Sequence, residues 1–191
     1  NNASIIVTGS IDLTGTRLPE LPRFGMRMEL QHPYENLTYY GRGPFENYID
    51  RYSGAFIGRY EDKVENQFYW YIRPQETGNK TDVRWLTLLD SGGLGVKITG
   101  LQPISFSALH FSPEDLDPGL TRKLQHTIDI VPQKNIFLHV DLKQRGLGGD
   151  NSWGMYPHNE YRLLDKKYTY SYMIELVEKG SDKNDYLNSR K

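Results

Sequence analysis

The chain of 191 residues contains no cysteine, which excludes disulfide bonds and thiolate chemistry but leaves its cellular compartment open. No uninterrupted apolar stretch approaches the roughly 18 residues of a membrane-spanning helix, so no membrane partner is predicted. Neither sign of charge dominates, because 23 Lys and Arg stand against 24 Asp and Glu. A nucleic-acid partner is not expected either, since proteins of that class carry a basic surface.

The beginning of the chain has neither an initiator methionine nor a signal peptide, since it reads Asn1-Asn2-Ala3-Ser4. We therefore expect a piece cut from a longer protein. Residues 1–17 are predicted to form a linker or edge ribbon from a preceding domain, with two short strands joined by a turn at Gly9-Ser10. Residues 18–178 are predicted to form one domain, and the polar, charged residues 179–191 a disordered tail.

Helix signals are scarce, and the one good example is Ser112-Pro113-Glu114-Asp115, where a cap, a first-turn proline and a capping-box acid follow one another. The 14 Tyr, 18 Gly and 10 Pro favour short strands joined by turns. Trp85–Leu89 and Val96–Leu101 are predicted to form a hairpin around residues 90–95. Many strands with almost no helix predict an antiparallel all-β sandwich, because parallel sheets need crossover helices.

Residues 136–143 alternate between an apolar set and a second set, Phe137, His139, Asp141 and Lys143. We expect the second set to form a polar outer face of the strand. His139 and Asp141 could offer two metal ligands, but two ligands do not make a site, and no metal is predicted.

Other aromatic side chains follow the same logic of strand faces. Tyr168, Tyr170 and Tyr172 share one side of the last strong strand, where they are predicted to form a sheet face. Trp70 and Trp85 lie in or beside apolar runs and are predicted to pack in the core or between domains.

The segment from Gly146 to Gly154 carries a tryptophan, Trp153, among small and polar residues. Glycines at 146, 148 and 149 disfavour a regular strand, so the segment is predicted to be a loop. An indole on a loop offers a flat apolar face and one N–H donor, which suits stacking on a sugar ring. The alternative is that Trp153 folds back and covers the edge of a sheet.

Four blocks of sequence resemble the C-terminal β-sandwich domain of the large bacterial β-galactosidases of glycoside hydrolase family 2. They follow the family's order, span roughly residues 18–177, and include the specific motif Gly-Arg-Gly-Pro-Phe-Glu-Asn-Tyr-Ile-Asp-Arg. The blocks are Leu21–Gly25, Gly41–Arg51, Pro74–Gly78 with Asp82–Trp85, and the Trp153 loop. The resemblance implies a large antiparallel supersandwich of two curved sheets, of the galactose-mutarotase-like kind.

The resemblance also implies a function, namely the hydrolysis of terminal β-D-galactosides by a longer enzyme. In that family the domain lies against a catalytic barrel, and the tryptophan of the matching loop lines the sugar-binding site. Trp153 is therefore expected to bind substrate, with Asp150, Asn151 and Ser152 shaping the loop. Asn151 stands where some relatives have an acid.

No catalytic residue is expected in this chain, because the family's acid/base and nucleophile lie on the barrel, which needs about 250 residues of its own. The isolated chain is predicted to be inactive. The resemblance implies no cofactor in this domain, although Mg²⁺ could bind elsewhere in the full-length enzyme. It also implies that the full-length enzyme forms a homo-oligomer, with the remaining domains of the polypeptide as partners. The sequence does not select between the bacterial cytoplasm and the periplasm.

Two groups of acidic residues are candidates for proton transfer within this chain. Glu46 and Asp50 lie close to Arg42 and Arg51, which favours an ion-paired loop over proton transfer. Glu76 invites an alternative function, because sugar mutarotases of related fold use a Glu and a His as base and acid.

The histidine that would partner Glu76 is not selected by the sequence, where His110, His126 and His139 are all candidates. The simpler interpretation is that Gln75 and Glu76 tie a turn to Arg84 or to a backbone donor. A free-standing carbohydrate-binding module is a third function for the chain. A single wall of a shared pocket encloses little ligand, which argues against that module.

Overall fold

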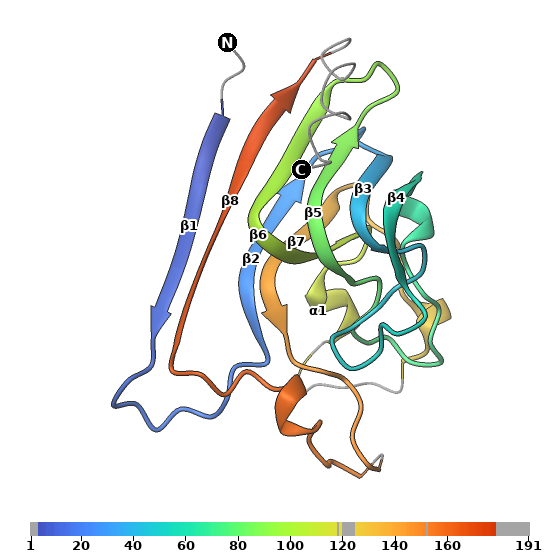
Figure 1. Ribbon diagram of the computed structural model, residues 1–191. Helices are drawn as coiled ribbons and strands as arrows, with labels where there is room; N and C mark the ends of the chain where they lie inside the picture. The colour runs from blue at the N-terminus through green and yellow to red at the C-terminus, as the bar shows by residue number, and fades with distance from the viewer. Residues whose placement is uncertain (1–3, 118, 120–124, 152, 179–191) are drawn as a thin grey trace.

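The computed structural model describes residues 4–117, 119, 125–151 and 153–178, and within them it contains eight strands and four short helical segments (Figure 1). The strands are β1 (Ser4–Asp12), β2 (Arg23–Leu30), β3 (Asn36–Gly43), β4 (Phe56–Lys63), β5 (Lys80–Leu89), β6 (Gly95–Leu109), β7 (Ile136–Gln144) and β8 (Lys167–Val177). The helical segments are η1 (Val64–Asn66), α1 (Pro113–Leu116), η3 (Thr127–Asp129) and η4 (Asn159–Tyr161). None of the described helices is long and apolar enough to span a membrane.

The long strand β6 organises the sheet. Along one edge β6 pairs with β5, which continues to β3 and β4. Along its other edge β6 pairs first with β8, over Gly95–Gly100, and then with β7, over Ser105–Leu109. Two arms, β8 with β1 and β7 with β2, therefore branch from the same edge, and every pairing is antiparallel. The predicted all-β antiparallel fold is confirmed.

The branch point has a specific set of hydrogen bonds. The side chain of Gln102 continues the ladder where the β6 backbone leaves β8: its Nε2 donates to the carbonyl of Ser171 at 3.0 Å, and its Oε1 accepts from the Ser171 N–H at 3.2 Å. Pro103 follows, and it has no N–H to donate. On the β5 side the register shifts twice, around Val83, and Asp82 takes a positive φ of 51°. These irregularities bend the sheet where its arms separate.

The two arms face each other across the main core. The ring of Phe24 on β2 lies 5.7 Å from the ring of Tyr168 and 5.6 Å from that of Tyr170, both on β8. The Tyr170 hydroxyl donates to the carbonyl of Val140 on β7 at 2.9 Å. Tyr168, Tyr170 and Tyr172 are buried, which confirms the predicted sheet face.

Two local predictions are confirmed. Residues 90–94 close the hairpin between β5 and β6, with Asp90 Oδ1 accepting from the N–H groups of Gly92 at 2.7 Å and Leu94 at 2.9 Å. Ser112 caps α1 in a complete capping box with Asp115. Both signals are local in sequence, so tertiary packing does not alter them.

The predicted turn at Gly9-Ser10 is wrong. Strand β1 runs without a break from Ser4 to Asp12 and pairs with β8 over its whole length. Gly9 serves packing instead, because a Cβ there would lie 2.9 Å from Cε1 of Tyr170. The boundary at residue 18 remains a prediction, and residues 179–191 lie outside the described part of the chain.

The predicted polar outer face of residues 137–143 is also wrong. Asp141 is fully buried and Phe137 nearly so, since β7 lies between β2 and β6. Trp70 is not a core residue, because 59% of it is exposed, although its ring contacts that of Phe68 edge-on at 4.9 Å. Trp85 is half-buried and stacks on Tyr40 of the neighbouring strand.

The tight contact between β2 and β7 yields a test of this packing. A Cβ added at Gly25 would lie 2.6 Å from the Cα of Asp141, so backbone would have to move. We expect Gly25→Ala to lower the free energy of unfolding by about 1–3 kcal/mol, measured by urea denaturation. Gly54→Ala is the control, because the nearest atom to its Cβ would be 3.6 Å away. Equal stability of the two variants would contradict this account of β2.

Candidate functional site

The loop between β7 and β8 projects beyond the strands and is fastened at its base (Figure 1). Glu20 accepts from Arg145 Nη1 at 3.1 Å and from Arg162 Nε at 2.6 Å, so one carboxylate joins the two ends of the loop. Burial raises the pKa of Glu20, but the two guanidinium groups outweigh it and hold that pKa below its usual value. The Tyr156 ring contacts both guanidinium groups, at 5.3 and 4.8 Å.

The first half of the loop is held by the motif at residues 41–51. Asp50 Oδ2 accepts from the N–H of Gly148 at 2.7 Å, and the N–H of Gly146 donates to the Tyr161 carbonyl at 2.8 Å. A Cβ at Gly146 would lie 2.7 Å from the Asp50 carboxyl carbon, so only glycine fits there without a shift. Two blocks about a hundred residues apart in sequence therefore form one structural unit.

The tip of the loop presents Trp153 to solvent, with 89% of the residue exposed. The backbone N–H of Trp153 donates to Asn151 Oδ1 at 2.8 Å, and Gly154 follows with a φ of +106°, a conformation that favours glycine. The indole does not cover a sheet edge, which was the alternative expectation. Asp150 Oδ1 lies 2.9 Å from His158 Nε2, and Ser152 lies outside the described residues.

The acids of the 41–51 motif make structural contacts. Glu46 pairs with Arg51 at 2.7 Å, accepts from the Gly78 N–H at 2.7 Å and bonds to the Tyr71 hydroxyl. This confirms the predicted ion-paired loop for Glu46 and Arg51. Arg42 pairs with Asp82 at 2.5 Å rather than with a neighbour in its own motif.

A second cluster of charged side chains surrounds Arg23, which sequence reasoning did not single out as a site residue. Its guanidinium lies 2.9 Å from Glu76 Oε1 and 3.0 Å from Asp141 Oδ2. It also lies 2.6 Å from His139 Nδ1, and it donates to Gln144. The expected partner of Glu76, Arg84, contacts the carbonyl of Asp82 instead.

Burial controls the protonation of this Arg23 cluster. It raises the pKa of Glu76, although Arg23 opposes the change, and it raises the pKa of Asp141 to about 7. It lowers the pKa of His139 to about 4, with Arg23 adding to the effect, so His139 is neutral near pH 7. The other candidate partners lie elsewhere, since His110 pairs with Glu35 at 3.1 Å and His126 is exposed.

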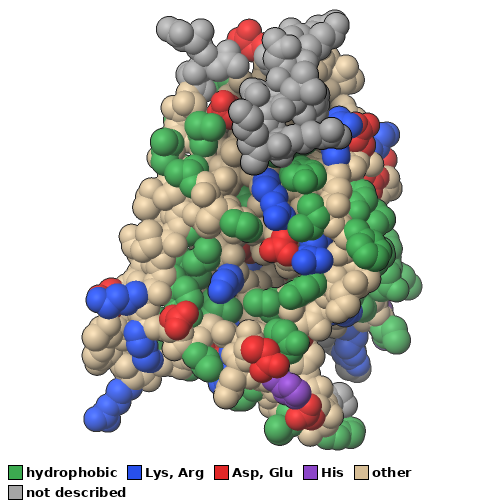
Figure 2. Space-filling model, viewed as in Figure 1, with side chains coloured by type: hydrophobic (Ala, Val, Ile, Leu, Met, Phe, Trp, Pro, Cys, Tyr) green, Lys and Arg blue, Asp and Glu red, His purple; other side chains and the backbone are tan. Residues whose placement is uncertain are grey.

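One face of the molecule carries side chains of both charges. On the face shown in Figure 2, Lys, Arg, Asp and Glu side chains are interspersed with hydrophobic ones. The fold and the loop together define an all-β domain that exposes Trp153 on a loop whose base is anchored by Glu20.

Comparison with known proteins gives the family. The family model described as "Beta galactosidase small chain" matches residues 2–174, and the chain belongs to this family. It is similar to β-galactosidases of Priestia megaterium (38% identity, 83% of this chain) and Streptococcus thermophilus (36% identity, 90% of this chain). The chain spans only 15% and 16% of those two relatives, whose sequences extend far beyond the matched segment.

The ion pair at the loop gives a pH-dependent test. The hydrogen bond and charge of Asp150 raise the pKa of His158, with a smaller contribution from Glu160. We expect Asp150→Asn to return the His158 midpoint, followed by NMR of the ring C–H, toward the ordinary value of about 6.5. Glu160→Gln is the matched control and should cause a smaller change. Identical midpoints in Asp150→Asn and the parent chain would show that the contact is not formed in solution.

Proposed function

We propose that this chain is the C-terminal domain of a β-galactosidase that hydrolyses terminal β-D-galactosides. The relatives that it matches bear the name β-galactosidase, and their greater length leaves room for a catalytic barrel in the same polypeptide. In this proposal the domain closes one wall of the sugar-binding pocket. The observation that carries it is the 89% exposure of Trp153 on a loop whose base is tied to the sandwich.

The domain would contribute binding and positioning rather than proton transfer. A retaining glycosidase needs two carboxyl groups about 5–5.5 Å apart, one of them able to give up a proton to the leaving group. Here Glu46 is held by Arg51 and a backbone N–H, while Asp141 is fully buried against Arg23. These two carboxyl groups make structural contacts, and the family resemblance assigns the reacting acids to the barrel.

The indole would act through stacking. Its flat face can cover the C–H surface of a sugar, most plausibly on the leaving-group side. The backbone that carries it is held by the hydrogen bonds from Trp153 N–H to Asn151 and from Gly148 N–H to Asp50. Positioning of this kind accelerates a reaction without moving a proton. The remaining domains of the polypeptide are the proposed partners and the proposed place of Mg²⁺ binding, and the full-length enzyme is proposed to form a homo-oligomer.

Substitution of Trp153 in the full-length enzyme tests the role of the loop. We expect Trp153→Ala to raise KM for substrate or weaken acceptor-sugar binding about tenfold, which corresponds to about 1.4 kcal/mol. Trp153→Phe should retain part of the affinity because it keeps a stacking surface. Leu147→Ala is the control, since Leu147 is 46% exposed on the same loop. Unchanged kinetics in Trp153→Ala would refute the role.

A mutarotase-like activity is the second candidate, because Glu76 and His139 lie on the same Arg23 side chain. Both also line a hollow of about 310 Å³. The pKa of His139, near 4, makes it a poor acid at neutral pH, which disfavours this function.

Two assays on the 191-residue chain separate these functions. We expect no hydrolysis of a nitrophenyl galactoside, because the chain would lack the acid/base and the nucleophile. We also expect no acceleration of the mutarotation of fresh α-galactose, followed by polarimetry, because His139 is neutral. Hydrolysis by the pure chain would overturn the non-catalytic assignment, and faster mutarotation that is lost in Glu76→Gln would establish the second candidate.

A further inference from the structure

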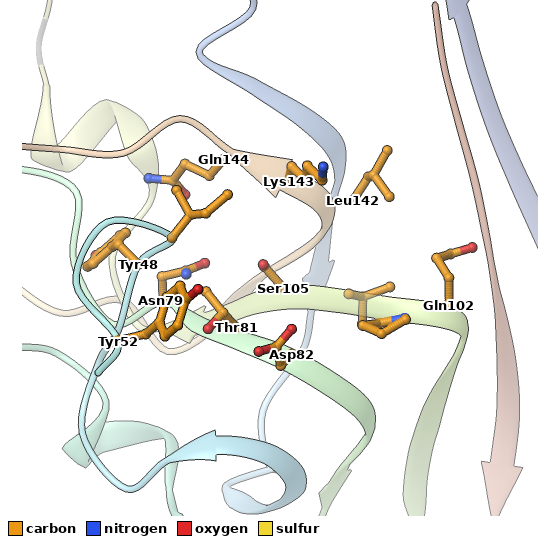
Figure 3. Close-up of a pocket in the computed structure, with 13 residues that line it drawn as sticks. Tyr48, Tyr52, Asn79, Thr81, Asp82, Gln102, Ser105, Leu142, Lys143 and Gln144 are labelled. Carbon is orange, nitrogen blue, oxygen red and sulfur yellow. The ribbon is translucent and has the colours of Figure 1, made fainter. Parts of the chain in front are cut away.

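A cavity of about 420 Å³ lies where the sheet divides, and no residue of the Trp153 loop lines it. Its walls come from four parts of the chain: the loop carrying Tyr48 and Tyr52, the start of β5, the bent middle of β6, and the end of β7. Figure 3 shows the two tyrosines at one end, Lys143 and Gln144 on one side, and Thr81, Asp82 and Ser105 opposite them. The volume falls within the range of about 300–1,000 Å³ that small-molecule sites occupy.

The cavity is a product of the fold rather than a gap in packing. β6 leaves β8 after Gly100 and joins β7 from Ser105, so the strands beside the intervening residues diverge. The register shifts around Val83 bend β5 at the same level. The cavity therefore results from the divergence of the strands at the point where the sheet branches.

Asn79 brings an unpaired hydrogen-bond acceptor to the wall of the cavity. The residue is 1% exposed, and its Nδ2 donates to the carbonyl of Asn47 at 2.8 Å. Because a carbonyl only accepts, this bond fixes the orientation of the amide. The Oδ1 atom then has no hydrogen-bond partner, and in Figure 3 the Asn79 side chain extends toward Ser105. An unpaired buried carbonyl favours a ligand that donates hydrogen bonds.

Further polar groups line the same space. Ser105 is 7% exposed, and none of the described residues makes a hydrogen bond to its hydroxyl. Asp82 uses Oδ2 to accept from Arg42, which balances its charge. These groups together match a ligand with several hydroxyl groups. The Ser105 hydroxyl can donate or accept, and the Asn79 amide oxygen accepts. The Asp82 carboxylate accepts while Arg42 balances its charge.

The remaining walls are apolar and suit a compact carbon skeleton. The rings of Tyr48 and Tyr52, with Ile104 and Leu142, supply aromatic and aliphatic surface. The guanidinium of Arg42 lies 4.4 Å from the centre of the Tyr52 ring and steadies it. Charged groups of both signs, Asp82 and Lys143, lie at the wall, so no excess of one sign favours an ionic ligand.

We propose that this cavity binds one neutral sugar unit of hexose size through residues of this chain alone. The hydroxyl groups of the sugar would reach Asn79, Ser105 and Asp82, and its C–H surface would lie on Tyr52. Binding here uses no residue of the Trp153 loop, so the proposal goes beyond the proposed function and stands without it.

NMR titration of the ¹⁵N-labelled 191-residue chain tests the site, with D-galactose, D-glucose and glycerol as separate probes. We expect saturable shifts at the amides of Thr81, Asp82 and Ser105 with a hexose, at roughly millimolar Kd for so small a ligand. Galactose and glucose distinguish which sugar unit fits better. Glycerol is expected to bind far more weakly, because it fills little of the space.

Two variants probe the walls of the cavity. Ser105→Ala removes one hydroxyl and Tyr52→Ala one aromatic surface, and each should weaken hexose binding about tenfold. Ser107→Ala is the matched control, since Ser107 is a buried serine on the same strand that lines a different hollow. In the 191-residue chain, Trp153→Ala should leave the hexose affinity measured at the amides of Thr81, Asp82 and Ser105 unchanged, because the Trp153 loop does not line the cavity.

Three outcomes would overturn the proposal, and none of them depends on a variant that fails to fold. The first is a well-dispersed spectrum of the parent chain with no saturable shift in either hexose, which would mean that water alone fills the cavity. The second is a set of shifts confined to the Trp153 loop and abolished in Trp153→Ala. The third is equal affinity for glycerol and for the hexoses.

Discussion

The pairing of one long strand with different neighbours along its two halves is the constraint from which this structure follows. One edge of β6 can pair with only one strand at any given residue. Its pairing therefore changes from β8 to β7 around Gln102 and Pro103. The Gln102 amide supplies the two hydrogen bonds to Ser171 that the departing backbone no longer makes. Because of this branch, the two arms can face each other and enclose Phe24 and the tyrosines of β8. A cavity opens at the same level, between the bent middle of β6, the start of β5, the end of β7 and the loop that carries Tyr48 and Tyr52.

The same architecture accounts for how the loop that carries an exposed indole is anchored to the sandwich. A loop tip with no packing of its own gains order only through its ends. Glu20 joins Arg145 to Arg162 at the base, and Asp50 holds Gly148 nearer the tip. The motif at residues 41–51 thus supports the loop in addition to closing its own turn. An anchored but solvent-facing tryptophan is the property that the proposed role in a β-galactosidase requires.

Buried charge was the part of the structure least accessible to sequence reasoning. Alternation along residues 136–143 predicted an exposed polar face, yet Asp141 is buried because β2 and β6 flank β7 and Arg23 reaches it from β2. The choice among three histidines likewise could not be made from spacing, since the contact of His139 with Arg23 spans 116 residues of sequence. Gly9 favours a turn in the sequence pattern, but in the structure it makes room for the Tyr170 ring on β8.

The sequence alone determined the features whose causes are local or compositional. These are the all-β class, the hairpin around Asp90, the cap of α1 at Ser112 and the family, which the motif at residues 41–51 already indicated. Only the tertiary structure decided which edge of β6 each strand uses, which side chains surround Arg23, and where a cavity opens. Those outcomes depend on contacts between segments distant in sequence, and an alternating pattern specifies the face of a strand but not the neighbour that it meets.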